Sequence, residues 1–363
     1  MSFKKKTFGD RPRTRLALRS HRVYVAGAMS QPASPTAQKK LARLAWAVLA
    51  YNVAVVLWGA FVRASGSGAG CGRHWPLCNG EVVPRPQSVA TVIEATHRAT
   101  SGIALIAVVV LLVRSLVVLP KGHRARRGAI LSTVFIFGEA LIGAGLVLFE
   151  LVAHDASMKR GLSMVLHLGN TFLLLGALAL TAWWITKGDA PRASAPRTPF
   201  AVRAAIVAAL GGVLVLGASG AVAALGDTLF PAASLREGIA QDLSPLAHVF
   251  LRLRLLHPIL ALGVGVLVLV AAGLVRALAP SAEAKRLSRA VTICFVVQFG
   301  AGLLNVTLLA PIGMQLVHLL LADLTWIALV LMGWEALQPM SSRNGPAPIS
   351  DVPPSTSSVA PVM

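Results

Sequence analysis

The chain has 363 residues, of which 55% are hydrophobic and only 13% are charged, and its mean hydropathy is +0.70. A soluble domain needs a more polar surface, so these values indicate a polytopic membrane protein. The formal net charge of +20 does not indicate nucleic-acid binding, because the Lys and Arg residues form short runs between apolar segments, as topology signals and lipid-headgroup contacts do.

The two ends of the chain are expected to be disordered. Residues 1–40 form a basic leader that lacks the apolar core of a signal peptide. Met29 is a second candidate for the first residue of the protein. Residues 1–28 are in that case a misassigned extension of the sequence. Residues 338–363 are rich in Pro and Ser, which is typical of a disordered tail.

Eight segments are long and apolar enough to cross a membrane, which takes about 20 residues. They are residues 42–63, 92–113, 129–150, 162–185, 202–225, 255–277, 288–310 and 314–337. Lys and Arg concentrate in the leader and in every second loop, and such loops stay in the cytoplasm. The sequence therefore predicts an all-α fold with both termini cytoplasmic and with the long loops 64–91 and 226–254 outside.

The two halves of the chain resemble each other. "FGEALIGAGLVL" in the third span has a counterpart in "VQFGAGLLNVTL" in the seventh, and "MVLHLGNTFLLLGALALTAWW" in the fourth matches "QLVHLLLADLTWIALVLMGWE" in the eighth. Four spans per half is an even number, so the repeat keeps its orientation. We predict two pseudo-symmetric four-helix bundles, residues 41–187 and 200–337, joined by a cytoplasmic linker at 188–199.

Four histidines follow this repeat. His97 maps to His257 (257 − 97 = 160) and His167 maps to His318 (318 − 167 = 151), and all four fall near the outer ends of their spans. Two imidazoles at similar depth in each half suit the two axial positions of a haem iron. One alternative is that the histidines form hydrogen bonds that pack the helices. A zinc site is disfavoured because the sequence has no ligand-rich cluster. A di-iron site is disfavoured because the further carboxylates that it needs are missing.

Other ionisable residues lie near these histidines. Four arginines are placed to meet haem propionates: Arg63, Arg98, Arg252 and Arg254. The remaining histidines lie outside the spans: His74 and His248 are either surface residues or approach a haem edge, whereas His21, His123 and His154 are expected to be ordinary loop residues.

Glu94 shares a helix face with His97, three residues later. The second half has Arg254 at the mapped position, so only one half keeps the acid. Glu94 is predicted to accept a proton or to stabilise a cationic intermediate; the alternative is a structural pairing with Arg98 or His97. Glu139, in the middle of the third span, maps near Gln298 and is expected to serve as a control acid.

Two cysteines, Cys71 and Cys78, lie in the first outer loop, "GCGRHWPLCNG". The outside of a membrane permits disulfides, and a loop of this length can close. The pair is either a structural staple or a redox-active couple. Cys294, inside the seventh span, is expected to be a packing residue.

The motifs "GAFVRASGSGAGCGRHWPLCNG", "IEATHRATSG", "LHLGN" and "LLHPILA" resemble the haem A synthase family over residues 41–337. The resemblance implies a membrane oxidoreductase of the bacterial inner membrane. Such an enzyme oxidises the C8 methyl group of haem O to a formyl group by successive hydroxylations, which gives haem A for terminal oxidases.

The resemblance also implies roles for particular residues. His97 and His167 would hold the substrate haem, Glu94 would be the essential acid, and a haem b cofactor would be bound between two further histidines, His257 and His318. Cys71 and Cys78 match the outer-loop pair of many members. Some members carry a second pair in the fifth-to-sixth loop, but residues 226–254 contain no Cys, which argues against a disulfide relay between the halves.

The implied partners are membrane lipid, a haem O synthase, an electron-transfer protein and a second copy of the chain. Two other functions remain open: a quinone-linked electron carrier with two b-type haems, and a transporter. The presence of the acid in only one half, with the cysteine pair beside it, argues against a simple electron carrier.

Overall fold

The structure is a computed structural model that describes residues 35–85, 88–188, 198–279 and 281–338. The C-terminal tail and most of the leader and the linker lie outside the described residues. Helix α1 begins at Pro35, so residues 35–40, which were expected within the leader, are helical.

Within the described residues, eight long helices confirm the predicted all-α membrane fold. They are α1 (Pro35–Ala64), α2 (Val89–Val118), α3 (Arg124–Leu148), α4 (Met158–Lys187), α5 (Phe200–Leu229), α7 (Val249–Leu278), α8 (Ala282–Thr307) and α9 (Ile312–Leu337), and each is long and apolar enough to cross a membrane. Several begin at a serine, for example Ser88, whose side chain accepts from Thr91 N, because a side-chain oxygen satisfies an N–H group that the helix leaves unpaired.

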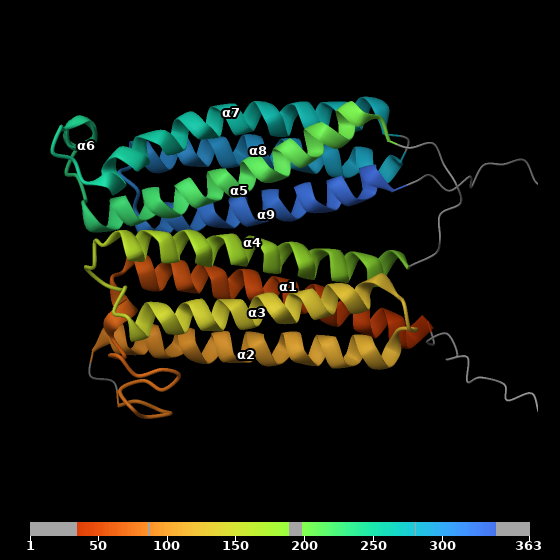
Figure 1. Ribbon diagram of the computed structural model, residues 1–363, viewed down its shortest axis with the longest axis horizontal. Helices are drawn as coiled ribbons and strands as arrows, with labels where there is room; N and C mark the ends of the chain where they lie inside the picture. The colour runs from red at the N-terminus through yellow and green to blue at the C-terminus, as the bar shows by residue number, and fades with distance from the viewer. Residues whose placement is uncertain (1–34, 86–87, 189–197, 280, 339–363) are drawn as a thin grey trace, which may run out of the picture. The chain divides into compact units, whose positions relative to one another are not determined.

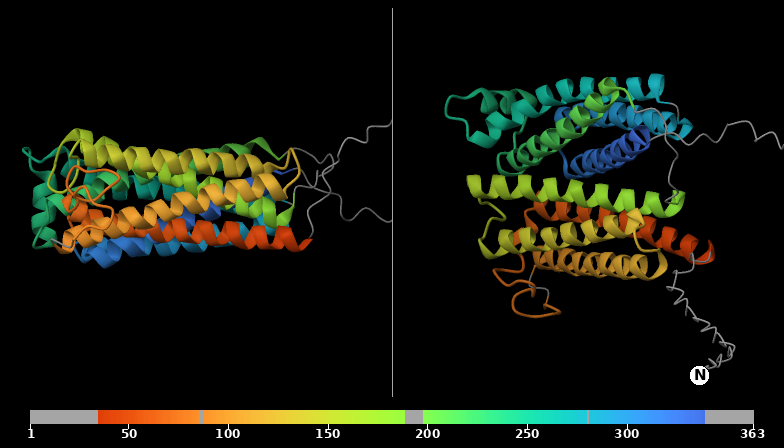
Figure 2. Two further views of the ribbon diagram at one scale, coloured as in Figure 1. Left: turned by 90° about the horizontal axis from the view of Figure 1, so that it is seen from below. Right: turned by 45° about the vertical axis from the view of Figure 1, so that its right-hand side comes forward.

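The helices pack as two groups of four. Helices α1–α4 pack together, and α5, α7, α8 and α9 pack together beside them (Figures 1 and 2). We call these groups the first and the second bundle. The bundles meet along α4 and α9, with α5 against α4 and α1 against α9.

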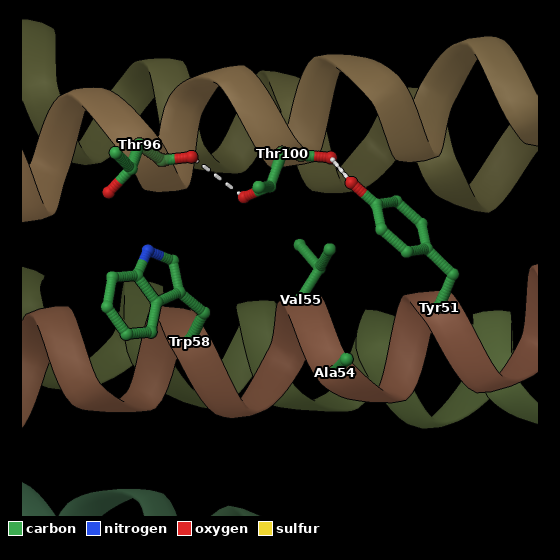
Figure 3. Close-up of a pocket in the computed structure, with 6 residues that line it drawn as sticks. All are labelled: Tyr51, Ala54, Val55, Trp58, Thr96 and Thr100. Atoms are coloured by element: carbon green, nitrogen blue, oxygen red, sulfur yellow. Dashed lines mark hydrogen bonds between the residues drawn. The ribbon is translucent and has the colours of Figure 1, made fainter.

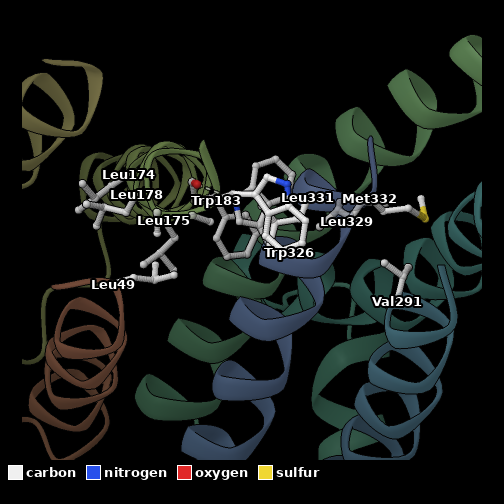
Figure 4. Close-up of a cluster of buried hydrophobic side chains, with 14 of the residues drawn as sticks. Leu49, Leu174, Leu175, Leu178, Trp183, Val291, Trp326, Leu329, Leu331 and Met332 are labelled. Carbon is white, nitrogen blue, oxygen red and sulfur yellow. Dashed lines mark hydrogen bonds between the residues drawn. The ribbon is translucent and has the colours of Figure 1, made fainter. Parts of the chain in front are cut away.

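Aromatic side chains stabilise the contact between the bundles. Trp326 of α9 stacks on Phe172 of α4 with ring centroids 5.3 Å apart, and its Nε1 donates to the Phe172 carbonyl at 2.5 Å. Trp183 Nε1 of α4 donates to Glu335 Oε1 of α9 at 2.8 Å. Figure 4 shows the two tryptophans among leucines of both helices. Because the indole N–H groups have acceptors, their burial leaves no unpaired donor there.

The two long loops lie at one end of the bundles (Figure 1). The first contains a short 3-10 helix, η1 (Ser67–Ala69), and the second contains α6 (Leu235–Leu243), which we did not predict. Ser234 caps α6 by accepting from Glu237 N at 3.2 Å, and Glu237 Oε2 accepts from Ala233 N at 2.9 Å. A Ser followed three residues later by Glu is a helix-start signal, so the sequence did contain a sign of α6.

Candidate functional site

The four repeat-related histidines lie within the first three turns of α2, α4, α7 and α9, at the end that carries the long loops. Each side chain is half-buried. In the first bundle His97 and His167 lie on α2 and α4, which both pack against α1 and α3. In the second bundle the rings of His257 and His318 are perpendicular, with an interplanar angle of 89°, and their centroids are 6.4 Å apart.

The spacing of His257 and His318 fits an iron between them. Two metal–imidazole bonds of about 2 Å each, plus roughly 1 Å from each nitrogen to its ring centre, place the centroids about 6 Å apart. The observed 6.4 Å is of this size, and the binding of a haem by these two histidines stays a prediction.

Hydrogen bonding leaves one nitrogen of His257 available. Its Nδ1 lies 2.9 Å from Ser219 Oγ, so Nε2 is the nitrogen that can bind a metal. His318 differs, because the Gln298 amide nitrogen lies 3.3 Å from His318 Nε2, while His318 Nδ1 is buried without a hydrogen-bond partner among the described residues. Ligation through His318 Nε2 requires this amide to turn aside.

A glycine faces a histidine in both bundles. A Cβ atom on Gly59 of α1 would lie 2.9 Å from His97 Cε1, and a Cβ on Gly220 of α5 would lie 3.0 Å from His257 Cε1. These contacts are repeat-related, since 220 − 59 = 161 and 257 − 97 = 160. Both imidazoles thus occupy space that any larger residue at the glycine would take.

Glu139 is not the neutral control that the sequence led us to expect. Its Oε2 lies 2.6 Å from His167 Nδ1, so a substitution here alters the surroundings of a predicted haem ligand. The sequence signal was available, because a carboxyl group inside a membrane span is costly and marks a functional position by default.

Glu94 joins α2 to the first outer loop. The side chain is 4% exposed, its Oε2 accepts from Cys71 N at 2.8 Å, and its Oε1 accepts from Arg98 Nε at 3.1 Å. Arg98 Nη1 also donates to the carbonyls of His74 and Leu77. The pairing with Arg98 that we considered as an alternative is therefore present.

The same loop contains a disulfide between Cys71 and Cys78, both buried. The disulfide ties together the segment whose backbone binds Glu94 and Arg98. The acid, the arginine and the disulfide loop form one connected network at the N-terminal end of α2.

The other three candidate arginines also have protein partners. Arg254 binds Asp242 of α6 at 2.6 Å and Asp227 of α5 at 3.1 Å, and Arg252 donates to the Pro245 carbonyl at 2.5 Å. Arg63 crosses between the bundles and donates to three acceptors: Ala224 O at 2.7 Å, Thr228 Oγ1 at 2.6 Å and Gln315 Oε1 at 2.7 Å. Propionate binding by these arginines stays a prediction, and it requires them to exchange or share these partners.

The remaining histidines have local roles. His248 precedes α7 and accepts from Phe250 N at 3.3 Å, whereas His74 and His154 are exposed. His123, expected in an ordinary loop position, is buried at the start of α3 and accepts from Ala125 N at 3.1 Å. His21 lies outside the described residues.

Sequence reasoning also missed Asp323. This residue of α9 is fully buried, and neither carboxylate oxygen has a hydrogen-bond partner among the described residues. Its position inside an apolar span was the available signal. Cys294, by contrast, is a free, partly buried residue of α8.

A pocket of about 300 Å³ lies between α1 and α2 (Figure 3). Its lining is Tyr51, Ala54, Val55, Trp58, Thr96 and Thr100. The Tyr51 hydroxyl donates to the Thr100 carbonyl at 3.2 Å across the pocket. Thr96 and Thr100 flank His97 in the sequence of α2, but the lining does not include His97.

Comparison with known proteins decides the family. Residues 42–330 match the family described as cytochrome oxidase assembly protein, COX15-CtaA. The chain belongs to this family. The match covers both bundles, including all four histidines, and confirms the resemblance drawn from the motifs.

Individual relatives match over different lengths. A protein of Thermus thermophilus named protoheme IX farnesyltransferase is 48% identical over 307 residues, which cover 85% of this chain and 50% of the relative. The chain thus spans about half the length of this relative and of its counterpart in a second strain of the same species. A heme A synthase of Bacillus mycoides is 42% identical over 111 residues, which cover 31% of this chain and 36% of the relative.

Proposed function

We propose that this COX15-CtaA protein is a haem A synthase, which oxidises the C8 methyl group of haem O to a formyl group by successive hydroxylations. The observation that carries the proposal is the pair of histidines in each bundle, at matched depth and on repeat-related helices. The relative named heme A synthase supports the reaction. The relatives named protoheme IX farnesyltransferase support a farnesylated haem as the substrate and a haem O synthase as a partner.

The two bundles have different tasks in this proposal. His97 and His167 hold the substrate haem O, and His257 and His318 hold a haem b. When bound, haem b supplies one-electron transfer. The 6.4 Å separation of the His257 and His318 rings supports the second assignment, and the contact of His257 Nδ1 with Ser219 Oγ, which directs a metal to Nε2, supports it further.

Glu94 is the proposed acid–base residue at the substrate. It is buried beside His97 and held by Arg98 and by the Cys71 N–H group. A carboxylate fixed in this way can accept a proton or stabilise positive charge that develops on the substrate without first reorganising. The same contacts support a staple role for the disulfide, because it orders the loop that binds Glu94.

The proposed location is the bacterial inner membrane with both termini in the cytoplasm. The haem sites then lie near the outer face, where an electron-transfer partner must reach them. Lipid surrounds the eight helices, and a second copy of the chain is a further proposed partner.

Haem extraction tests the proposed reaction. Membranes of cells that supply haem O should contain haem A when the parent chain is present. The variants His97→Ala and His167→Ala should abolish haem A, and His257→Ala or His318→Ala should also reduce the b-type absorbance of the purified protein. His154→Ala, which changes an exposed loop histidine, is the matched control and should behave as the parent.

Two outcomes would contradict the proposal. A parent protein that binds two b-type haems and forms no haem A from supplied haem O would instead be a quinone-linked electron carrier. A purified parent without a Soret band would favour a transporter.

A further inference from the structure

Glu139 is hydrogen-bonded on one carboxylate oxygen inside the first bundle, and its other oxygen lies in close contact with His167. Oε2 lies 2.6 Å from His167 Nδ1, and Oε1 accepts from Asn170 Nδ2 at 2.6 Å and from the Thr171 hydroxyl at 3.1 Å. The Glu139 side chain is 16% exposed. A carboxyl group placed this deep in a membrane protein needs such partners.

The supporting residues hold Glu139 in one position. Asn170 Nδ2 also donates to the Phe135 carbonyl at 2.8 Å, which fixes the amide on α3. Gly138 permits this approach, because a Cβ there would lie 2.8 Å from Asn170 Oδ1. The carboxylate is therefore oriented before any ligand binds.

This contact selects one nitrogen of His167. The two atoms are not aligned as a hydrogen bond, but a carboxylate oxygen only 2.6 Å from Nδ1 favours a proton on that nitrogen, which leaves Nε2 for iron. Histidine ligands commonly donate their second N–H to a carboxylate or carbonyl, which orients the ring and raises the basicity of the ligating nitrogen.

The second bundle lacks this arrangement. Gln298 occupies the position that maps near Glu139, and its amide nitrogen lies 3.3 Å from His318 Nε2, not Nδ1. In the first bundle a carboxylate thus lies at Nδ1 of the histidine. In the second bundle a neutral amide lies at Nε2 of the histidine.

We propose that Glu139 is a positioning residue for the substrate haem, which acts through His167 and makes the first-bundle iron a poorer electron acceptor than the second-bundle iron. The inference rests on the proposed function, because it takes His167 as an axial ligand of haem O. A more basic imidazole donates more charge to the iron and stabilises its oxidised form. The two bundles therefore hold haems of different reduction potential.

The test titrates haem O into the purified full-length protein in detergent and follows Soret absorbance and spectroelectrochemistry. Glu139→Ala removes the contact and should weaken haem O binding about 10- to 100-fold. Glu139→Gln keeps an acceptor for Nδ1–H without the charge, so binding should fall less, while the reduction potential of the bound haem O shifts upward. Glu150→Gln makes the same change at an acid that is 62% exposed and should leave both readouts at parent values.

The absorbance of resident haem b is the internal standard for folding. If the haem O affinity and potential of Glu139→Gln and Glu139→Ala both equal those of the parent, the inference is wrong. Loss of resident haem b together with haem O would also overturn it, because Glu139 would then maintain the fold. His167→Ala separates the two proposals: if it retains parent haem O affinity, the ligand assignment itself fails.

Discussion

Glu94 shows how one acid can be both structurally bound and chemically useful. Its two oxygens bind the disulfide loop and Arg98, yet the second bundle does without an acid at this position. There Arg254 takes the place of Glu94 and binds Asp242 and Asp227. In both bundles an arginine thus anchors the outer loop, so loop anchoring does not by itself require a carboxylate on α2.

We therefore expect Glu94→Gln to stop haem A formation while the protein and its haem b persist. The glutamine oxygen can still accept from Cys71 N, and Arg98 keeps the carbonyls of His74 and Leu77 as acceptors. What is lost is a charge at the substrate, and one such group commonly contributes about 3 kcal/mol to a barrier, which is roughly a hundredfold in rate.

The measurement compares haem A, haem O and hydroxylated haem in extracts of cells that express Glu94→Gln or the exposed control Glu150→Gln. Haem O or a hydroxylated product should accumulate only with the first. Wild-type haem A levels with Glu94→Gln would mean that the acid serves the fold alone.

At the scale of helices, a glycine opposite a histidine lets two helices pack closely: Gly59 of α1 faces His97 of α2, and Gly220 of α5 faces His257 of α7. Gly59→Ala places a methyl group 2.9 Å from His97 Cε1, so α1 or the imidazole must move. Overpacking of this kind costs about 1–3 kcal/mol, and we expect a loss of haem O affinity of about tenfold or more.

Gly102→Ala is the matched control, because a Cβ on Gly102 of α2 meets nothing within 4 Å. Affinities are compared by the same Soret titration, with thermal unfolding of both variants as a check on stability. Equal haem O affinity in the two variants would show that the site tolerates displacement of His97.

Elements with a local sequence signature were predictable, and contacts between distant segments were not. Apolar length predicted the eight spans, and the repeat pointed to His257 and His318, whose ring centroids lie 6.4 Å apart. Propionate binding by Arg63 stays a prediction, whereas its hydrogen bond to Gln315, 252 positions away, could not be predicted, because no periodicity reveals such a pair. The Glu139–His167 contact joins α3 to α4 in the same way, since only packing decides which residue an intramembrane acid faces.

At the scale of the whole molecule, orientation connects the charge pattern, the disulfide and the haem sites. The disulfide loop and α6 lie at one end of the bundles, and the basic residues that begin α3 and α8 lie at the other (Figure 1). From the positive-inside rule we predict that the basic end lies in the cytoplasm. Cys71 and Cys78 then lie outside, where disulfides persist.

Reporter fusions should confirm this arrangement. Fusions after residue 80 or 240 should report an external location, and fusions after residue 122, 283 or 337 a cytoplasmic one. The internal control is alkylation of Cys71 and Cys78 in intact cells, which should occur only after an impermeant reductant is added. An inverted fusion pattern would place the disulfide in a reducing compartment and all four histidines near the cytoplasmic face, and the proposed delivery of electrons from outside would then be wrong.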